Sequence, residues 1–166
     1  MQILKNKNKL VYYDKKILEK IIKLSNNKRG RSRVCIHLTN KSKTNEMIIC
    51  LRKESFIPPH IHPRGKTESY HVIKGKMSVL LFNKSGKCLK IIKMGDINSG
   101  QNFYYRMNSS FYHMPVATSK YCIYHETYSG PFVKKKDVIF PSWSPKEENV
   151  VSVKEFLSKI NIRGIK

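Results

Sequence analysis

The stretch from Pro58 to Gly75, PPHIHPRGKTESYHVIKG, is the most informative part of the chain. Its two histidines, His60 and His62, are separated by one residue, so in an extended strand both rings point to the same face. That spacing suits two imidazoles that bind one divalent ion. Glu68 follows the turn-forming Pro63-Arg64-Gly65 and begins the next expected strand, from which it could return a carboxylate to the same ion. We therefore predict a metal site here.

A further ligand is available about fifty residues along the chain. His113 lies in the sequence Ser110-Phe111-Tyr112-His113-Met114-Pro115, between β-like segments. Three histidines and one glutamate leave one or two open positions on an octahedral ion, which suits catalysis better than a closed structural site. Such a set accepts iron, manganese, nickel, cobalt or zinc, so the sequence predicts one divalent metal ion without identifying it.

The chain before and after this stretch has the pattern of an all-β domain. Asp14 is placed to cap a short helix that ends at about Leu24. Asn83-Lys84-Ser85-Gly86 predicts a hairpin turn. Short β-rich segments at regular spacing, without helices between them, predict an antiparallel sandwich or barrel. The expected strands are Val34–Leu38, Glu46–Leu51, Tyr70–Ile73, Met77–Phe82, Cys88–Ile92, Asn102–Arg106 and Tyr121–Thr127.

The strand pattern ends after Gly130-Pro131-Phe132. The segment Pro141-Ser142-Trp143-Ser144-Pro145 carries the only tryptophan, which we expect to close one end of the barrel or to form a wall of the pocket. Ser152 is placed to cap a final helix from Val153 to about Ile160.

On these residues the chain resembles the cupins, and specifically the WbuC-family cupin-fold metalloproteins. His60, His62, Glu68 and Gly75 match the first cupin motif, and His113 matches the last histidine of the second. The similarity extends from about Arg31 to Trp143. Three departures stand out: Glu54 replaces the opening glycine, Glu68 lies one residue further from His62 than is usual, and Asn108-Ser109-Ser110 replaces Pro-x-Gly.

The resemblance implies a cupin double-stranded β-helix, a jelly-roll barrel with short N-terminal and C-terminal helices, and an ion at one end of the barrel. It also implies a homodimer. We accordingly expect an N-terminal helical extension over residues 1–30, a cupin barrel over 31–130 and a C-terminal extension over 131–166 that packs on the barrel.

Three further residues are candidates for chemistry in the predicted pocket. Arg106 is expected to point into the barrel, with Tyr105 pointing out, and to bind either an anionic substrate or a neighbouring glutamate. His125 and Glu126 are neighbours in a strand, so at most one faces inward, and the family match favours Glu126. His37 is a pocket candidate through the resemblance, although a lone histidine is more often structural.

Two classes of function follow. The first is a metal-dependent enzyme, an isomerase or epimerase that acts on a small anionic or sugar intermediate of bacterial surface-polysaccharide synthesis, as the resemblance implies; an Fe(II) dioxygenase is an alternative within it. The second is a non-enzymatic cupin module that binds metal or sugar. Fold alone does not choose between them, because one fold hosts many chemistries.

Composition limits the partners and the cellular location that we expect. The 166 residues include 33 Lys and Arg against 11 Asp and Glu, a net charge of +22. An excess of this kind favours anionic partners, but it also matches the lysine-rich composition typical of AT-rich genomes. The charge is spread along the chain without a basic and aromatic nucleic-acid motif, so we do not expect nucleic acid as a partner. No apolar run could span a bilayer, no signal peptide is evident, and the four cysteines suit a reducing compartment, so we expect a cytoplasmic protein.

Overall fold

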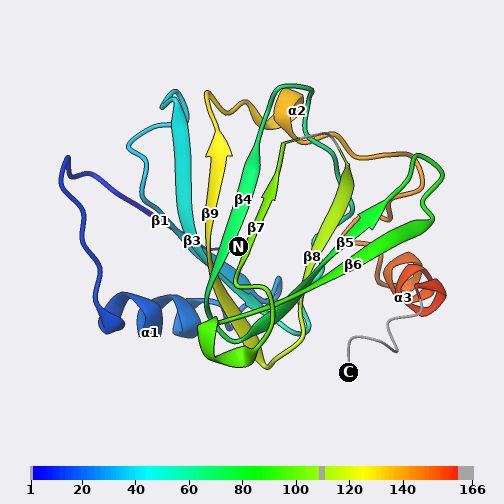
Figure 1. The fold of residues 1–166 in the computed structure, drawn as a ribbon, viewed down its shortest axis with the longest axis horizontal. Coiled ribbons are helices and arrows are strands. Elements are labelled where there is room, and N and C mark those ends of the chain that lie inside the picture. Colours follow the sequence, from blue (N-terminus) through cyan, green and yellow to red (C-terminus); the bar gives the residue numbers. More distant parts are fainter. Residues whose placement is uncertain (1, 109–110, 161–166) are drawn as a thin grey trace.

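The computed structural model describes residues 2–108 and 111–160, which form two facing β-sheets and a few short helices (Figure 1). This confirms a mostly β fold. The larger sheet has the order β1 (Gln2–Lys5), β2 (Arg31–Cys35), β3 (Thr44–Arg52), β9 (Tyr121–Ser129), β4 (Glu68–Lys74) and β7 (Tyr104–Met107). The smaller sheet has the order β6 (Cys88–Gly95), β5 (Lys76–Phe82) and β8 (Tyr112–Ala117). Neighbouring strands are antiparallel, except that β1 runs parallel to β2.

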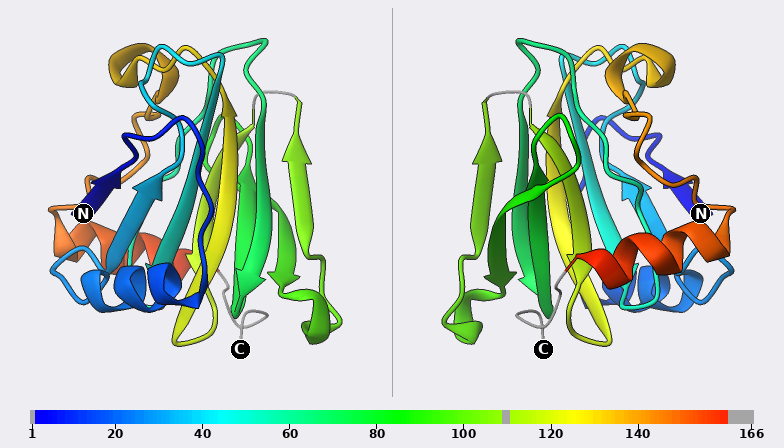
Figure 2. Two further views of the ribbon diagram at one scale, coloured as in Figure 1. Left: turned by 90° about the vertical axis from the view of Figure 1, so that its left-hand side faces the viewer. Right: turned by 90° about the vertical axis from the view of Figure 1, so that its right-hand side faces the viewer.

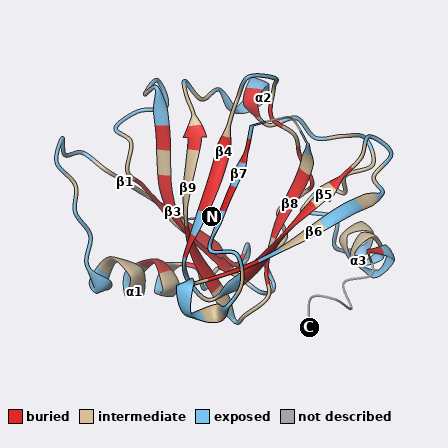
Figure 3. Cartoon of the chain, in the orientation of Figure 1, coloured by how far each residue is buried: buried red, intermediate tan, exposed pale blue. Residues whose placement is uncertain are grey.

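The main core lies between the two sheets and is drawn from alternate residues of each strand (Figure 3). On β3, Met47, Ile49 and Leu51 point into this core. Ile48 and Cys50 point to the opposite face of the large sheet, where they pack against a helix. Because β3 is buried on both faces, its sequence is an almost continuous apolar run instead of an alternating one.

Two helices cover the outer faces of the sheets (Figures 1 and 2). The first, α1 (Lys15–Leu24), is capped by Asp14 as predicted, and its Ile21 is fully buried against the large sheet. The second, α3 (Val150–Lys159), packs on the small sheet. Its cap is Asn149, whose side chain accepts a hydrogen bond from the Ser152 amide, so the predicted cap at Ser152 is three residues too late. Two shorter helices are η1 (Ile97–Ser99) and α2 (Lys134–Asp137).

Two strands were not expected from the sequence. Strand β8 contains Pro115, which argues against a central strand, but β8 is an edge strand of the small sheet and tolerates proline there. Strand β1 lies in the segment predicted to be only helical, and it extends the large sheet beside β2. The predicted hairpin turn is confirmed between β5 and β6, where Gly86 has a φ of +85°.

The two sheets approach each other at one end and diverge toward the other, so that they form a V in the view of Figure 1. His60 connects to the small sheet through a pair of backbone hydrogen bonds with His113. Within residues 2–108 and 111–160, no helix has the length and apolarity needed to cross a membrane.

Candidate metal centre

Three histidines meet between the sheets. His60 and His62 lie in the connection from β3 to β4, in a short extended segment held between β8 on one side and Ile139 on the other. Because residues 60 to 62 are extended, both rings point to the same side, toward His113 of β8. Nitrogen atoms of the three rings lie within 4.8 Å of one another, and all three side chains are buried.

Backbone carbonyl groups fix the orientation of all three rings. The Nδ1 atoms of His60 and His113 lie 3.0 Å from the carbonyl oxygens of Pro58 and Phe111. Nδ1 of His62 makes the corresponding contact with the carbonyl of Asp137. A carbonyl oxygen only accepts, so each Nδ1 carries a hydrogen, which leaves the Nε2 of a neutral ring with the lone pair that a metal needs.

Glu68 joins the two sheets at this point. It begins β4 of the large sheet, is 3% exposed, and lies with Oε1 3.2 Å from Nε2 of His62. Its Oε2 lies 3.1 Å from Nε2 of His113, on the small sheet, yet neither of these two buried atoms has a hydrogen bond of acceptable geometry. Buried polar atoms without partners are costly. These two atoms approach each other from opposite sheets, and a cation bound between them would give both a partner.

The electrostatics favour imidazole ligands. Burial, followed by the neighbouring His113, lowers the pKa of His60 to about 3, so this ring is neutral at physiological pH. Burial also acts to lower the pKa of His62, but the hydrogen bond and charge of Glu68 outweigh it and raise the pKa above its ordinary value. Burial would raise the pKa of Glu68, whereas His113 and His62 hold it well below its usual range. Glu68 is therefore an anion at the centre of the cluster.

These observations fit a divalent cation. The donor set of neutral imidazole nitrogens and one carboxylate oxygen is the kind that zinc, iron, manganese, nickel and cobalt accept. The fixed tautomers, the ionised Glu68 and the unpartnered atoms of Glu68 and His113 all point to one position. The residues that would hold the ion are the four predicted from the sequence, His60, His62, Glu68 and His113.

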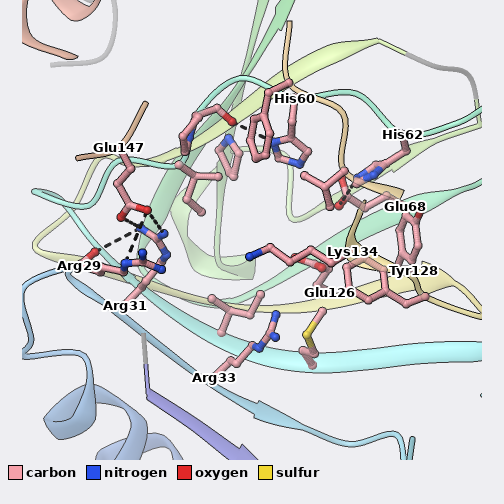
Figure 4. Close-up of a pocket in the computed structure, with 18 of the residues that line it drawn as sticks. Arg29, Arg31, Arg33, His60, His62, Glu68, Glu126, Tyr128, Lys134 and Glu147 are labelled. Carbon is pink, nitrogen blue, oxygen red and sulfur yellow. Dashed lines mark hydrogen bonds and ion pairs between the residues drawn. The ribbon is translucent and has the colours of Figure 1, made fainter. Parts of the chain in front are cut away.

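A cavity of about 920 Å³ opens beside this cluster. The two histidines of the connection, His60 and His62, line it together with Glu68 (Figure 4). Its other walls come from the large sheet and from the segment that follows α2. Besides Glu68, the large-sheet residues are Ile3, Arg31, Arg33, Asn45, Met47, Ile49, Tyr70, Tyr124, Glu126 and Tyr128.

Glu126 faces this cavity from β9, whereas His125 lies on the other side of the strand, 3.4 Å from Glu46. Burial, with the negative charge of Glu68 as the next cause, raises the pKa of Glu126 to about 8, although Arg33 and His62 act to lower it. A carboxyl group with a pKa close to neutrality can both accept and donate a proton in the physiological range.

His37 also lines the cavity, from the loop after β2. Its Nδ1 lies 3.0 Å from both the backbone nitrogen and the backbone oxygen of Glu46. This ring is therefore held by the backbone, with its Nε2 remaining for other contacts.

The expectation that Arg106 points into the barrel is wrong. Arg106 is exposed, and its Nε donates to Oδ1 of Asn108, while the neighbouring Tyr105 is buried in the core. Strand register explains the difference, because Tyr105 pairs with the inward-facing Tyr70. Burying a phenol beside other aromatic rings costs far less than burying an unpaired guanidinium group.

The basic residues that do reach the cavity went unrecognised in the sequence. They are Arg31 and Arg33 of β2, Lys134 of α2, and Arg29 and Lys146 of the connecting segments. The spacing Arg31-x-Arg33 on a strand was an available signal, since it places both side chains on one face. Lys134 gave no such signal, because it is one of three consecutive lysines in a segment without a strand pattern.

Comparison with protein families gives a match to part of the chain. A family described as a domain of unknown function, DUF6016, matches residues 13–94, a little under half of the chain and a range that includes His60, His62 and Glu68. Comparison with curated protein sequences gives no match.

Solved structures match more widely. An oxalate oxidase bound to the substrate analogue glycolate aligns with a TM-score of 0.52 and 16% identity, over 70% of this chain and 57% of that one. This chain thus spans little more than half the length of that oxidase. Protein SO0799 from Shewanella oneidensis aligns with a TM-score of 0.55 and 10% identity, over 74% of this chain and 83% of that one. At these identities the likeness concerns the fold, and oxalate oxidase is a cupin. The chain therefore has a cupin-like fold, with a three-histidine candidate metal centre between its two sheets.

Proposed function

We propose that this protein is a metal-dependent enzyme that acts on a small polar molecule, with isomerase or epimerase chemistry. One observation supports the proposal above the others: a buried cluster of three oriented histidines and Glu68 opens onto a cavity that also holds Glu126, a carboxyl group with a raised pKa. A divalent ion bound by the cluster would supply a Lewis acid that polarises a carbonyl or hydroxyl oxygen.

The residues of the chain would perform the remaining work. Tyr70, Tyr124 and Tyr128 line the cavity, and their rings would shield part of a bound molecule from water. In an isomerisation, Glu126 would take a proton from the carbon atom next to a substrate carbonyl and return it to the former carbonyl carbon on the same face, while the hydroxyl proton moves to the former carbonyl oxygen. An epimerisation would need a second proton donor on the opposite face. This transfer needs a group that is readily protonated and deprotonated near neutral pH, which suits the raised pKa of Glu126.

Metal content is the first test. Elemental mass spectrometry of the purified, tag-free protein is expected to find near-stoichiometric divalent metal, and the double variant His60→Ala/His62→Ala is expected to lose it. His71→Ala is the matched control, because His71 is an exposed histidine on the outer side of β4. Absence of metal from the wild type, even after reconstitution, would contradict the proposal.

Proton transfer is the second test. The metal-loaded protein is incubated in deuterated water with a panel of aldoses, ketoses and nucleotide sugars, and mass spectrometry measures deuterium at carbon. Incorporation that Glu126→Gln abolishes, with metal retained, supports the enzyme. Saturable binding of a panel member without incorporation would favour the non-enzymatic module. Oxygen consumption by an iron-loaded protein would favour the dioxygenase.

The finer parts of the proposal rest on the family resemblance alone. They are a WbuC-type role in surface-polysaccharide synthesis and a homodimer. A cytoplasmic location is also part of the proposal and rests on the composition of the sequence. The metal and exchange experiments do not depend on them.

A further inference from the structure

Arg33 is placed in the cavity by the pleat of β2. Arg31, Arg33 and Cys35 face the space between the sheets, whereas Ser32 and Val34 face α1. The two arginines therefore extend along one wall of the cavity, on the same inner face of the large sheet as Glu126.

The charge of Arg31 is already satisfied by the protein. Its two terminal nitrogens lie 2.8 Å from the two carboxylate oxygens of Glu147. It also donates to Oγ of Ser55 and to the carbonyl of Phe56. A paired guanidinium group of this kind holds the segment around Glu147 in place and has little capacity left for a ligand.

Arg33 differs from Arg31 in this respect. Within residues 2–108 and 111–160 it forms no ion pair, and its Nε is buried without a hydrogen-bond partner. A buried donor without a partner costs free energy, more so when the group is charged. In Figure 4 the guanidinium group of Arg33 points into the cavity, on the side away from His60 and His62.

Lys134 adds a second cation. It enters from α2, and in Figure 4 its amino group points into the same space as the guanidinium of Arg33. Lys134 is exposed, and in the described part of the chain it forms no ion pair. Among the described residues, the cationic groups of the cavity that form no ion pair are thus the half-buried Arg33 and the exposed Lys134 and Lys146. The imidazole and carboxylate cluster lies at another part of the wall.

We propose that the cavity binds an acidic small molecule whose carboxylate or phosphate group is held by Arg33, with Lys134 as the second cation. The remaining polar part of the molecule then extends toward His60 and His62. This inference rests on the proposed function and adds the substrate class to it. A planar guanidinium group matches the two oxygens of a carboxylate or phosphate, which is why arginine suits this role.

The experiment observes Arg33 directly. Sodium acetate and sodium phosphate are titrated separately into the wild-type protein at constant ionic strength, and NMR follows the Nε–H resonance of Arg33. A saturable shift with at least one anion, beyond any change with sodium chloride, is expected. Acetate and phosphate distinguish a carboxylate from a phosphate ligand.

Thermal stabilisation by the same anions gives the affinities of the variants. Arg33→Gln is expected to weaken binding roughly ten- to a hundredfold, as loss of a charge-assisted pair implies. Arg33→Lys keeps the charge but lacks the planar guanidinium group, so its affinity should lie between those of the wild type and Arg33→Gln. Arg106→Gln is the matched control, since it removes the same charge from an exposed arginine of the same sheet and should leave the affinity unchanged.

Two results would overturn the inference: an Arg33 resonance that responds to neither anion, or equal weakening by Arg33→Gln and Arg106→Gln. The first does not depend on whether a variant folds. Metal content is measured on the same samples. Anion binding that depends on Arg33 in a protein that holds no metal would reject the proposed function and leave this inference standing.

Discussion

Burial keeps His60 in the form that a metal ligand requires. With its pKa lowered to about 3, this ring has a free lone pair at any pH at which the protein would be studied. Burial also acts to lower the pKa of His62, but the hydrogen bond and charge of Glu68 outweigh it, so this pKa is raised. The pKa values of these two neighbouring candidate ligands are therefore shifted by different causes, desolvation for His60 and the contact with Glu68 for His62.

Glu126 makes stability depend on pH. Its pKa is about 8 in the folded protein, against an ordinary value of 4.5, so between these values the folded state keeps a proton that the unfolded state has lost. Stability therefore falls as pH rises through this range. In metal-free protein, Glu126→Gln should remove a penalty on the order of 1–3 kcal/mol at pH 9 and have little effect near pH 4.5, since part of the carboxylate remains solvated.

Urea unfolding at several pH values, in the presence of a chelator, measures this difference. Glu155→Gln is the control, because Glu155 is exposed on α3. If the unfolding midpoints of Glu126→Gln and the wild type ran parallel from pH 5 to pH 9, the ionised carboxylate would carry no cost in the fold.

Among the elements, the segment between α2 and α3 connects the outside of the small sheet to the cavity. Trp143 packs outside, with its ring stacked on Phe156 at 6.2 Å and 5.5 Å from Phe82. Its indole nitrogen donates to the carbonyl of Lys84. The expectations that Trp143 plugs the barrel or lines the pocket are therefore wrong, although its neighbours Ser142 and Ser144 do line the cavity.

Trp143→Ala should destabilise the protein by about 2–3 kcal/mol, less than for a fully buried tryptophan, because the ring is half-buried. Chemical unfolding measures the loss. Limited trypsin digestion should in addition show faster cleavage at the lysines of α2, because the segment is released from the small sheet. Val150→Ala, at a position 61% exposed, is the control. An unchanged midpoint for Trp143→Ala would show that Phe156 and Tyr112 hold the segment without it.

Local patterns predicted those elements whose own residues determine them. Helix α1 has its cap and apolar stripe within eleven residues, and the hairpin at Asn83 carries its own turn chemistry. Strand β8 depends instead on its place at a sheet edge, which no local pattern reveals. The prediction for the orientation of Arg106 was wrong for the same reason, since that orientation follows from the register of β7 on β4.

The four candidate ligands could be named in advance because ligand chemistry restricts the choice to histidines and a carboxylate at suitable spacing. The sequence could not supply the carbonyl of Asp137 that orients His62, since this contact depends on how the C-terminal segment folds back. The sequence could not show either that the charge of Arg33 has no ion-pair partner. This is evident only when Glu147 is seen to pair with Arg31 and not with Arg33.

For the molecule as a whole, charge is far from balanced. The chain has 33 basic and 11 acidic residues, and several of the acids are committed to local contacts, such as Glu68 in the histidine cluster and Glu147 with Arg31. The excess basic side chains repel one another in the compact folded state, which lowers its stability.

Screening should relieve this repulsion. Raising sodium chloride from 20 to about 300 mM shortens the range of charge interactions to less than about 10 Å, so the melting temperature should rise by a few degrees. Differential scanning fluorimetry measures the change, with sucrose at equal osmolality as the uncharged control. A melting temperature that falls with salt would show that attractive pairs outweigh the repulsion.

The contact between His62 and Asp137 has a consequence for the protein during translation. The two residues are 75 positions apart, which corresponds to roughly 4–15 s at ribosomal rates of 5–20 residues per second. During that interval the nascent chain already contains His60, His62 and Glu68, but the carbonyl that orients His62 has not been made. The complete ligand arrangement therefore arises late in the life of the nascent chain, and until then its histidines are exposed to whatever ions the surroundings contain.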